Sequence, residues 1–279
     1  MPVKRPKGSR RTWLFVAGAD EAAHAKAARS GADVIVLELE DFTPPPLRAE
    51  ARALSSKALG RWRRAGAVTA IRINPLETCG LQDLAGVVAA RPDVILMSKV
   101  ATPEQVKALD EATGGVVDLV PNIESAAGLV RTFEIARASK RVAALLIASE
   151  DMVADLGTSR SRSGGELAYV RSRFLVECRA AGVEAIDRPY TFSDLEGAVA
   201  DARYARQLGY RMKSLVDPKH AKAINAVFTP SADEVKKAAR IVKAFERARA
   251  KGKDRAKVDG ALIEVPIYAA AKRLLGSDK

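Results

Sequence analysis

Eight short apolar runs alternate with helical segments along most of this 279-residue chain. The runs are residues 12–16, 33–39, 68–73 and 94–97, the two that begin at Leu119 and Leu145, and residues 184–187 and 212–216. Strands joined by helices pair in parallel, and strands covered on both faces are near-continuously apolar. Eight such units predict a closed (β/α)8 TIM barrel. A doubly wound open sheet is the alternative, but no GxGxxG motif follows the first run.

The predicted helices begin and end at residues that favour helix termini. Pro103 stands where a helix should start, and Gly182 and Gly209 stand where two helices should end. The last helix of the series spans about residues 232–250, after which the pattern breaks and a short helix follows over about residues 266–275. We therefore predict a barrel domain over residues 1–251 and a C-terminal lid or oligomerisation tail over residues 252–279.

Two carboxylates end neighbouring strands in the middle of the chain. Glu124 ends the run that begins at Leu119, and Asp151 follows the run that begins at Leu145. Parallel strands bring such residues to one edge of the sheet, where α/β folds place their chemistry. Carboxylates without a nearby His or Cys suit Mg²⁺ rather than Zn²⁺. The alternative is that both residues only cap the helices that follow them.

Further polar side chains stand at the ends of the other predicted strands. A cation, an arginine and several acids at one barrel mouth suit a carboxylate-bearing substrate whose oxygen becomes anionic. About half of them could instead be partners in structural salt bridges. These strand-end residues are Glu38, Glu40, Asp41, Arg72, Asn74, Lys99 and Asp187.

Composition excludes several classes of protein. The formal net charge of +12 raises the question of nucleic-acid binding, but aromatic residues make up only 5% and no aromatic platform interleaves with the basic clusters. No apolar run approaches the length of a membrane span, and no secretory signal is visible. The two cysteines, Cys79 and Cys178, form no CxxC pair, which is typical of a reducing cytoplasm. We expect a cytoplasmic protein with a small-molecule substrate.

Several motifs, in their order and spacing, resemble the citrate lyase β-subunit-like proteins of the HpcH/HpaI aldolase superfamily, which includes malyl-CoA and citramalyl-CoA lyases. The resemblance covers the chain almost end to end. Its motifs are residues 11–16 as the opening strand, the acidic segment 38–41, Arg72-Ile73-Asn74, Ile123-Glu124-Ser125, Glu150-Asp151 with Asp155-Leu156-Gly157, and residues 179–182 and 185–187.

This resemblance implies a TIM barrel that cleaves a carbon–carbon bond of a β-hydroxyacyl-CoA and releases an acyl-CoA and an α-keto acid. Mg²⁺ is the implied cofactor, with Glu124 and Asp151 as its ligands. Arg72, Glu40 and Glu264 are the implied catalytic residues, and Glu264 is the candidate base, delivered by the tail to a neighbouring subunit. Arg72, Arg11 and Lys99 are the implied substrate-binding residues. The implied assembly is a homo-oligomer, either a trimer or a hexamer.

This chain departs from the family pattern at several positions, which leaves the acyl group and the need for CoA open. Two other functions stay open at this stage. One is a CoA-independent class II aldolase of 4-hydroxy-2-oxo acids, which relies on a His base that only His24 or His220 could supply. The other is a non-catalytic anion- or nucleic-acid-binding barrel. The departures are Ala17, Glu38, Ser98, Ala148, Ser149, Asp217 and Glu264.

Overall fold

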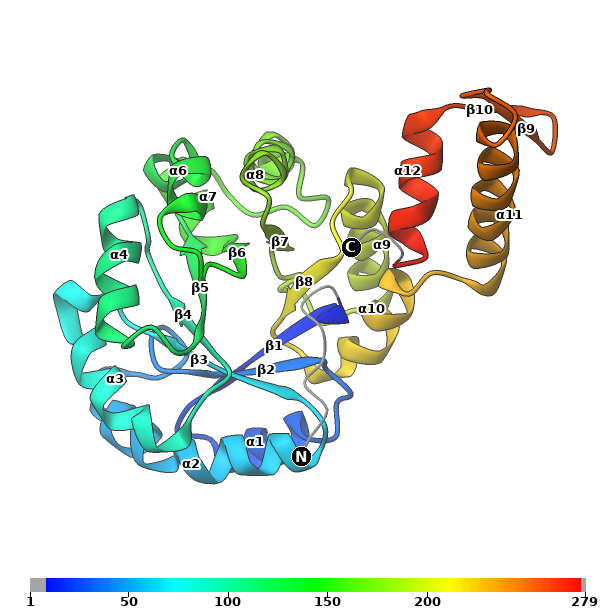
Figure 1. Ribbon diagram of the computed structural model, residues 1–279. Coiled ribbons are helices and arrows are strands. Elements are labelled where there is room, and N and C mark those ends of the chain that lie inside the picture. Colours follow the sequence, from blue (N-terminus) through cyan, green and yellow to red (C-terminus); the bar gives the residue numbers. More distant parts are fainter. Residues whose placement is uncertain (1–8, 277–279) are drawn as a thin grey trace. The chain divides into compact units, whose positions relative to one another are not determined.

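The computed structural model describes residues 9–276 and contains a closed barrel of eight parallel strands in the order β1 to β8 (Figure 1). Neighbouring strands pair in sequence order, and β8 closes the barrel against β1. The predicted (β/α)8 fold is therefore confirmed. The strands are β1 (Thr12–Ala17), β2 (Val34–Glu38), β3 (Val68–Ile73), β4 (Val94–Met97), β5 (Asp118–Ile123), β6 (Ala144–Ile147), β7 (Glu184–Asp187) and β8 (Met212–Leu215).

Helices follow the strands and surround the barrel (Figure 1). Gly182 and Gly209, with φ of 77° and 114°, end two of them in the left-handed conformation that glycine tolerates, as predicted. The barrel helices are α1 (Glu21–Ala27), α2 (Arg48–Arg64), α3 (Leu81–Val87), α4 (Pro103–Ala112), α5 (Ala126–Leu129), α6 (Thr132–Arg137), α7 (Glu150–Asp155), α8 (Ala168–Ala181), α9 (Leu195–Leu208) and α10 (Ala221–Phe228).

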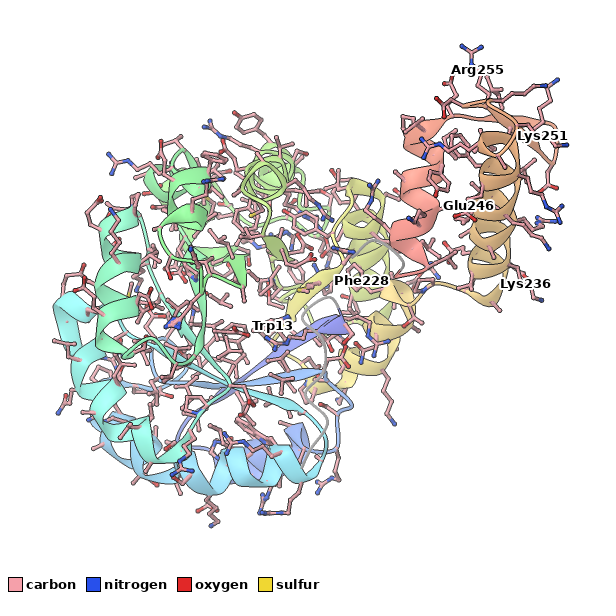
Figure 2. All side chains as sticks on the ribbon, in the orientation of Figure 1. Trp13, Phe228, Lys236, Glu246, Lys251 and Arg255 are labelled. Atoms are coloured by element: carbon pink, nitrogen blue, oxygen red, sulfur yellow. The ribbon has the colours of Figure 1, made fainter. Side chains whose placement is uncertain are left out.

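Alternating side chains of the strands form two cores. One cluster fills the inside of the barrel and draws on all eight strands. Its largest members are Trp13, labelled in Figure 2, and Phe15, both of β1. The other cluster joins the outward-facing strand residues to the surrounding helices, as Ile71 of β3 and Trp62 of α2 illustrate. Successive strand residues alternate between these two cores. Only the strand residues that face the inside of the barrel can therefore reach its mouth.

The second compact unit covers residues 229–279. It contains the helices α11 (Ala232–Arg249) and α12 (Val265–Leu274) and the antiparallel strands β9 (Ala256–Val258) and β10 (Ala261–Ile263). Its core joins Phe245 of α11 to Ile263 and Ala271, and the Phe245 ring stacks on Tyr268 at 4.5 Å. Lys236 and Lys251 extend from this unit into solvent (Figure 2), so the basic residues of α11 line its solvated face.

Two boundaries differ from the sequence predictions. The division between the units falls after Phe228 and not at residues 251/252, because the apolar stripe of α11 packs within the second unit. The alternating pattern gives one helical segment between successive runs, but β5 and β6 are separated by two short helices, α5 and α6, which meet at Val130 and Arg131. Within residues 9–276 no helix is both long enough and apolar enough to cross a membrane.

We predict that the chain tolerates truncation after residue 228 better than truncation after residue 251. The shorter protein keeps the whole barrel, whereas the longer one keeps α11 without Ile263 and Ala271, which cover its apolar stripe. Circular dichroism melts and size-exclusion chromatography of both truncations test this. A 1–228 protein that stays unfolded beside a folded 1–251 protein would show that α11 completes the barrel core.

Candidate functional site

Three charged side chains at the carboxyl ends of their strands point toward the inside of the barrel. Glu38 continues the inward-facing series of β2, and Arg72 continues that of β3. These two residues are direct neighbours in the strand register. Glu124, just after β5, faces the same side of the strand as Val120, which belongs to the inner core. The alternation that sequence left open therefore directs these three predicted residues into the mouth.

The Arg72 guanidinium is the centre of the site and contacts three buried carboxylates; its Nη2 also lies 3.8 Å from Oδ2 of the half-exposed Asp41. Its Nε donates to Glu38 Oε1 at 2.9 Å, its Nη2 lies 3.0 Å from Glu40 Oε2, and its Nη1 lies 3.5 Å from Glu124 Oε1. Only 7% of the Arg72 side chain is exposed. Burial by itself lowers the pKa of Arg72, but Glu38, Glu124 and Glu40 outweigh this effect and raise the pKa. The guanidinium is therefore permanently charged.

Glu38 positions both Arg72 and the loop that follows β2. Its two carboxylate oxygens accept hydrogen bonds from the backbone N–H groups of Glu40 and Phe42, both at 2.6 Å. The Glu38 side chain is fully buried. A carboxylate that holds an arginine and two loop amides at once fixes the site without needing to touch a ligand.

Glu40 lies between Arg72 and a lysine from the end of β4. Lys99 Nζ is 2.5 Å from Glu40 Oε1 and 3.8 Å from Asp41 Oδ1. Burial raises the pKa of the Glu40 carboxyl, and the charge of Arg72 and the hydrogen bond from Lys99 oppose this effect. Lys99 has a φ of +55°, a conformation that lysine rarely adopts and that directs its side chain toward the mouth.

Glu124 is a buried carboxylate with an unused oxygen. Its Oε1 accepts a 3.4 Å hydrogen bond from Asn122 Nδ2, while its Oε2 has no hydrogen-bond partner within residues 9–276. The pKa of Glu124 is raised to about 8: burial is the largest cause, Arg72 opposes it, and the acidic neighbours Glu40, Asp151 and Asp41 add to it. A carboxylate in this environment is stabilised in its charged form by a cation.

Asp151 supplies the second predicted metal ligand. It lies in the first turn of α7, is partly exposed, and acts electrostatically on both Glu124 and Lys99. The part of the chain that the structure describes contains no cluster of three or more His, Cys, Asp or Glu residues suited to a metal. Two carboxylates and an unpaired oxygen nevertheless fit Mg²⁺, which commonly keeps water and substrate oxygens as its other ligands.

Two predicted residues of the barrel unit lie away from this mouth group, and a third belongs to the second unit. Arg11, predicted to bind substrate, lies at the amino-terminal end of β1, where Nε and Nη2 donate to Asp33 at 2.8 and 3.0 Å. That is the opposite end of the barrel, and this prediction is corrected: Arg11 binds the start of β2. Glu264 belongs to the second unit, where its carboxylate lies 4.0 Å from Arg255. Asn74 donates to Leu39 O and supports the chain behind the mouth.

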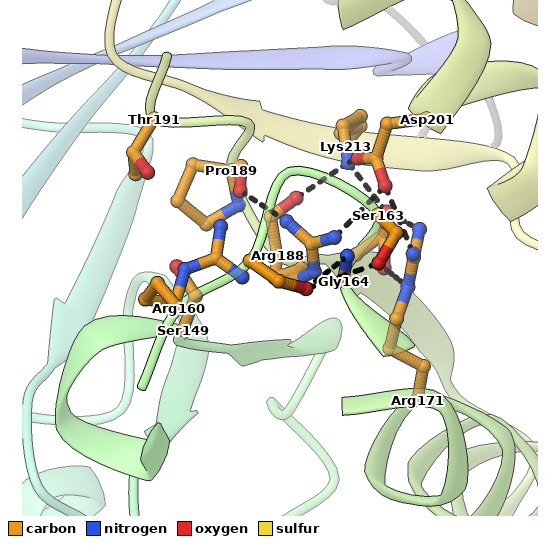
Figure 3. Close-up of polar contacts among 12 residues, drawn as sticks. Ser149, Arg160, Ser163, Gly164, Arg171, Arg188, Pro189, Thr191, Asp201 and Lys213 are labelled. Atoms are coloured by element: carbon orange, nitrogen blue, oxygen red, sulfur yellow. Dashed lines mark hydrogen bonds and ion pairs between the residues drawn. The ribbon is translucent and has the colours of Figure 1, made fainter. Parts of the chain in front are cut away.

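Asp187 belongs to a buried ionic network between the barrel and its helices. Arg171 of α8 donates to both Asp187 oxygens at 2.9 and 2.8 Å, and Lys213 Nζ donates to Asp187 Oδ2 at 2.6 Å. Asp201 of α9 accepts from Arg171 and Arg188 at 2.9 Å each (Figure 3). The strand alternation points Asp187 away from the barrel interior, so its role is structural.

Most of the departure positions lie at strand ends without chemistry of their own. Ser98 donates to Ile73 O at 3.3 Å, and Asp217 caps the turn at Pro218 by accepting from the Lys219 N–H. The sequence interpretation overlooked Arg160 and Arg188, which lie in loops after β6 and β7. Their isolated positions in the sequence carry no signal, because only the fold brings the two loops together.

Neither histidine is placed as a base in this mouth group. His24 is buried beside Trp62, with its ring nitrogen 3.0 Å from Ala17 O. Burial lowers the pKa of His24, since the charged ring loses its solvation. His220 is also buried and contacts the backbone oxygen of Ser193. Both are structural histidines.

We predict a pH-dependent stability difference between the metal-free protein and its Glu124→Gln variant. The pKa of about 8 in the folded state exceeds that of the unfolded chain, so between about pH 5 and 8 the folded state binds more protons. The free energy of unfolding of the wild type should therefore fall relative to the variant as pH rises, by at most about 1.4 kcal/mol per pH unit. Urea titrations in chelator check this, and a constant difference across that range contradicts it.

Comparison with known proteins places this geometry in a family. The profile of the HpcH/HpaI aldolase/citrate lyase family matches residues 11–218, more than half of the chain. The chain is 32% identical to the citrate lyase subunit beta of Leuconostoc mesenteroides subsp. cremoris, over 95% of this chain and 92% of that protein. It is 31% identical to the L-malyl-CoA/beta-methylmalyl-CoA lyase of Cereibacter sphaeroides, again over 95% and 92%.

The fold agrees with these sequence relationships. The structure of CitE from Mycobacterium tuberculosis in complex with magnesium, acetoacetate and coenzyme A matches with a TM-score of 0.79 and 25% identity, over 98% of this chain and 99% of that chain. A citrate lyase beta subunit from the same organism, complexed with oxaloacetate and magnesium, matches 80% of this chain with a TM-score of 0.69 and 27% identity. Together with the profile match, these similarities confirm the resemblance seen in the sequence: this chain belongs to the HpcH/HpaI aldolase/citrate lyase family.

Proposed function

We propose that this protein is a Mg²⁺-dependent carbon–carbon lyase that cleaves a β-hydroxyacyl-CoA, such as malyl-CoA or citramalyl-CoA, to an acyl-CoA and an α-keto acid. The observation that carries this proposal is the unpaired Glu124 Oε2 beside Arg72 and Asp151 at the barrel mouth. Relatives named as citrate lyase beta subunits and malyl-CoA lyases support the reaction class. Solved relatives that contain magnesium support the metal.

Glu124 and Asp151 would hold the metal, which when bound supplies a Lewis acid that stabilises negative charge on a substrate oxygen. Arg72 lies 3.5 Å from Glu124, so a substrate carboxylate or keto oxygen held beside Glu124 is also within reach of the guanidinium. Guanidinium can give two parallel hydrogen bonds to such a group. Arg72 thereby orients the substrate and stabilises the developing charge.

Proton transfer requires a base for the substrate hydroxyl. We propose that Glu264, delivered by the tail of a neighbouring subunit, removes the hydroxyl proton; Glu40 then supports proton movement within the mouth, since burial raises the pKa of its carboxyl. Breaking the carbon–carbon bond leaves an α-keto acid and the enolate of the acyl-CoA, which takes up a proton. Lys99, beside Glu40 and half exposed, would bind an anionic part of the substrate.

The second unit carries features that favour an assembly of identical subunits. Leu262, Val265 and Ile267 flank Glu264 and are 47%, 44% and 42% exposed. Three large apolar side chains around one candidate base suit a surface that becomes covered on assembly. We therefore propose a homo-oligomer, a trimer or a hexamer, in the cytoplasm.

We predict that Glu124→Ala and Asp151→Ala each abolish Mg²⁺ binding and cleavage while the barrel stays folded. Arg72 keeps Glu38 and Glu40 as partners when Glu124 is removed, and Asp151 is partly exposed, so the melting temperature should change by only a few degrees. The assay incubates each protein with Mg²⁺ and malyl-, methylmalyl- or citramalyl-CoA, beside free 4-hydroxy-2-oxo acids, and identifies the products. Glu104→Gln, an exposed acid on α4, is the matched control.

Two outcomes separate the alternatives. Activity retained in both alanine variants, or in excess chelator, would refute a metal-dependent reaction. Cleavage of free 4-hydroxy-2-oxo acids without any CoA ester being cleaved would instead favour the CoA-independent aldolase, although neither histidine lies with Arg72 and Glu124 to serve as its base.

A further prediction tests whether Glu264 acts across subunits. Glu264→Gln and Arg72→Ala should each be inactive alone, because one lacks the base and the other lacks the charge that orients the substrate. When the two variants are dissociated and reassembled together, mixed oligomers contain intact pairs and should regain activity. Asp254→Asn, an exposed acid of the same unit, should stay active. Mixtures that reassemble but remain inactive show that Glu264 serves its own barrel or does no chemistry.

A further inference from the structure

Two arginine side chains from neighbouring loops are buried at the carboxyl end of the barrel (Figure 3). Arg188 directly follows β7, and Arg160 lies in the loop between α7 and α8. Only 1% of the Arg188 side chain and 10% of the Arg160 side chain is exposed. Burial lowers the pKa of Arg188; Asp201 and Asp187 oppose this effect, and the charges of Arg171 and Arg160 add to it. The fold thus holds like charges close together.

Each of these two guanidinium groups has an unused donor. Arg160 Nη2 and Arg188 Nε are buried and have no hydrogen-bond partner in the described part of the chain. Buried polar groups in folded proteins are nearly always paired, so two orphaned N–H groups on adjacent arginines need an explanation. An acceptor that carries negative charge is the group that satisfies both.

The charge balance around Arg188 leads to the same conclusion. Its buried network holds three cations, Arg171, Arg188 and Lys213, against two carboxylates, Asp187 and Asp201. Without Arg188 the remaining four side chains form a balanced set. Arg188 therefore brings one positive charge more than the network needs, on the side of the network that faces Arg160 (Figure 3).

A rim carboxylate, Glu150, already binds other donors beside these two unused N–H groups. Glu150 Oε1 accepts from Arg160 Nε and Thr191 Oγ1, both at 3.1 Å, and from Ser149 Oγ at 3.5 Å. Three donors from different loops converge on one carboxylate oxygen. The Glu150 side chain is 58% exposed and so is free to move, whereas Glu166 holds Arg160 Nη1 at 3.1 Å and keeps that guanidinium in place.

The loop that carries Arg160 is shaped around Arg188. Gly164 has a φ of +67°, and a Cβ at this position would overlap Nη2 of Arg188. Only glycine lets the backbone approach the guanidinium so closely. Arg188 Nη1 also donates to Pro189 O at 3.0 Å, and Nη2 donates to Asp201. The guanidinium is therefore fixed in position, as a preorganised binding group should be.

We propose that Arg160 and Arg188, with the hydroxyls of Ser149 and Thr191, form a second anion-binding subsite at the barrel mouth. It takes an anionic oxygen group of the substrate, distinct from the group that Arg72 orients, and Glu150 occupies its outer edge when no ligand is bound. The group is a carboxylate of the acyl or oxo acid, or a phosphate of CoA. This inference rests on the proposed function, because it assigns a further anionic group to the same substrate.

The test measures ligand binding by the full-length protein with Mg²⁺, using calorimetry and not turnover. One arm compares 2-oxo dicarboxylates with monocarboxylates of equal chain length: oxaloacetate with 2-oxobutyrate, and 2-oxoglutarate with 2-oxovalerate. The other arm compares CoA with pantetheine, which lacks the phosphates. The wild type should bind the more anionic member of at least one pair about tenfold tighter or more.

Four variants then assign this preference to residues. Arg160→Gln should reduce it to about threefold or less without changing affinity for Mg²⁺ or for the less anionic member of the pair. Glu150→Gln should increase it, because a competing carboxylate is lost. Arg162→Gln is the matched control, since Arg162 is 69% exposed on the same loop and pairs with Asp194. Arg188→Gln should reduce the preference as Arg160→Gln does. If the Arg188→Gln protein does not fold, the results for Arg160→Gln and Glu150→Gln alone decide whether the proposal holds.

The outcomes distinguish this subsite from the proposed reaction. If Arg160→Gln loses the preference for dicarboxylates, the subsite binds a substrate carboxylate. If it loses the preference for CoA over pantetheine, the subsite binds a phosphate. A wild type without preference in either arm overturns the proposal, and so does a preference that neither Arg160→Gln nor Glu150→Gln changes. If the binding results are as expected but no CoA ester is cleaved, the subsite stands and the proposed lyase function fails.

Discussion

One guanidinium keeps three carboxylates together at the mouth of this barrel. Arg72 lies within 3.5 Å of Glu38, Glu40 and Glu124, and all four side chains are almost fully buried. Removing one partner of a buried ion pair typically costs about 3–5 kcal/mol, because the remaining charge is left uncompensated. Without Arg72 these acids would repel one another or take up protons. The arginine is therefore both the structural centre of the site and its candidate substrate-orienting group.

The carboxylates around Arg72 do different work because their surroundings differ. Glu38 uses its oxygens on two loop amides and on the arginine, so it is committed to structure. Glu124 has an oxygen left over, and burial, with a further contribution from its acidic neighbours, raises its pKa to about 8. Chemically identical side chains in one cluster are thus separated into a positioning residue and a candidate metal ligand by their hydrogen bonds.

The same end of the barrel carries a second group of charged side chains, with a different ratio of cations to carboxylates. The mouth around Arg72 has more carboxylates than cations, whereas the network around Arg188 has three cations for two carboxylates. A barrel mouth with an acid-rich side and a base-rich side suits a ligand that brings a cation to one and an anion to the other. The metal-bound acyl-CoA that we propose as substrate would have this character.

The sequence by itself determined the eight parallel strands, the glycine helix ends and most of the residues at the mouth, because strand ends and apolar periodicity are local properties. It also determined the family, through motifs that lie in order along the chain. Only the tertiary structure decided which strand-end side chains point inward, since a shift of one residue reverses every side chain. It placed Arg11 at the far end of the barrel beside Asp33, Asp187 in a structural network, and α11 with the tail. It also brought Arg160 and Arg188 together. Ion pairs and shared cores join residues far apart in the chain, and their partners are chosen by packing in three dimensions.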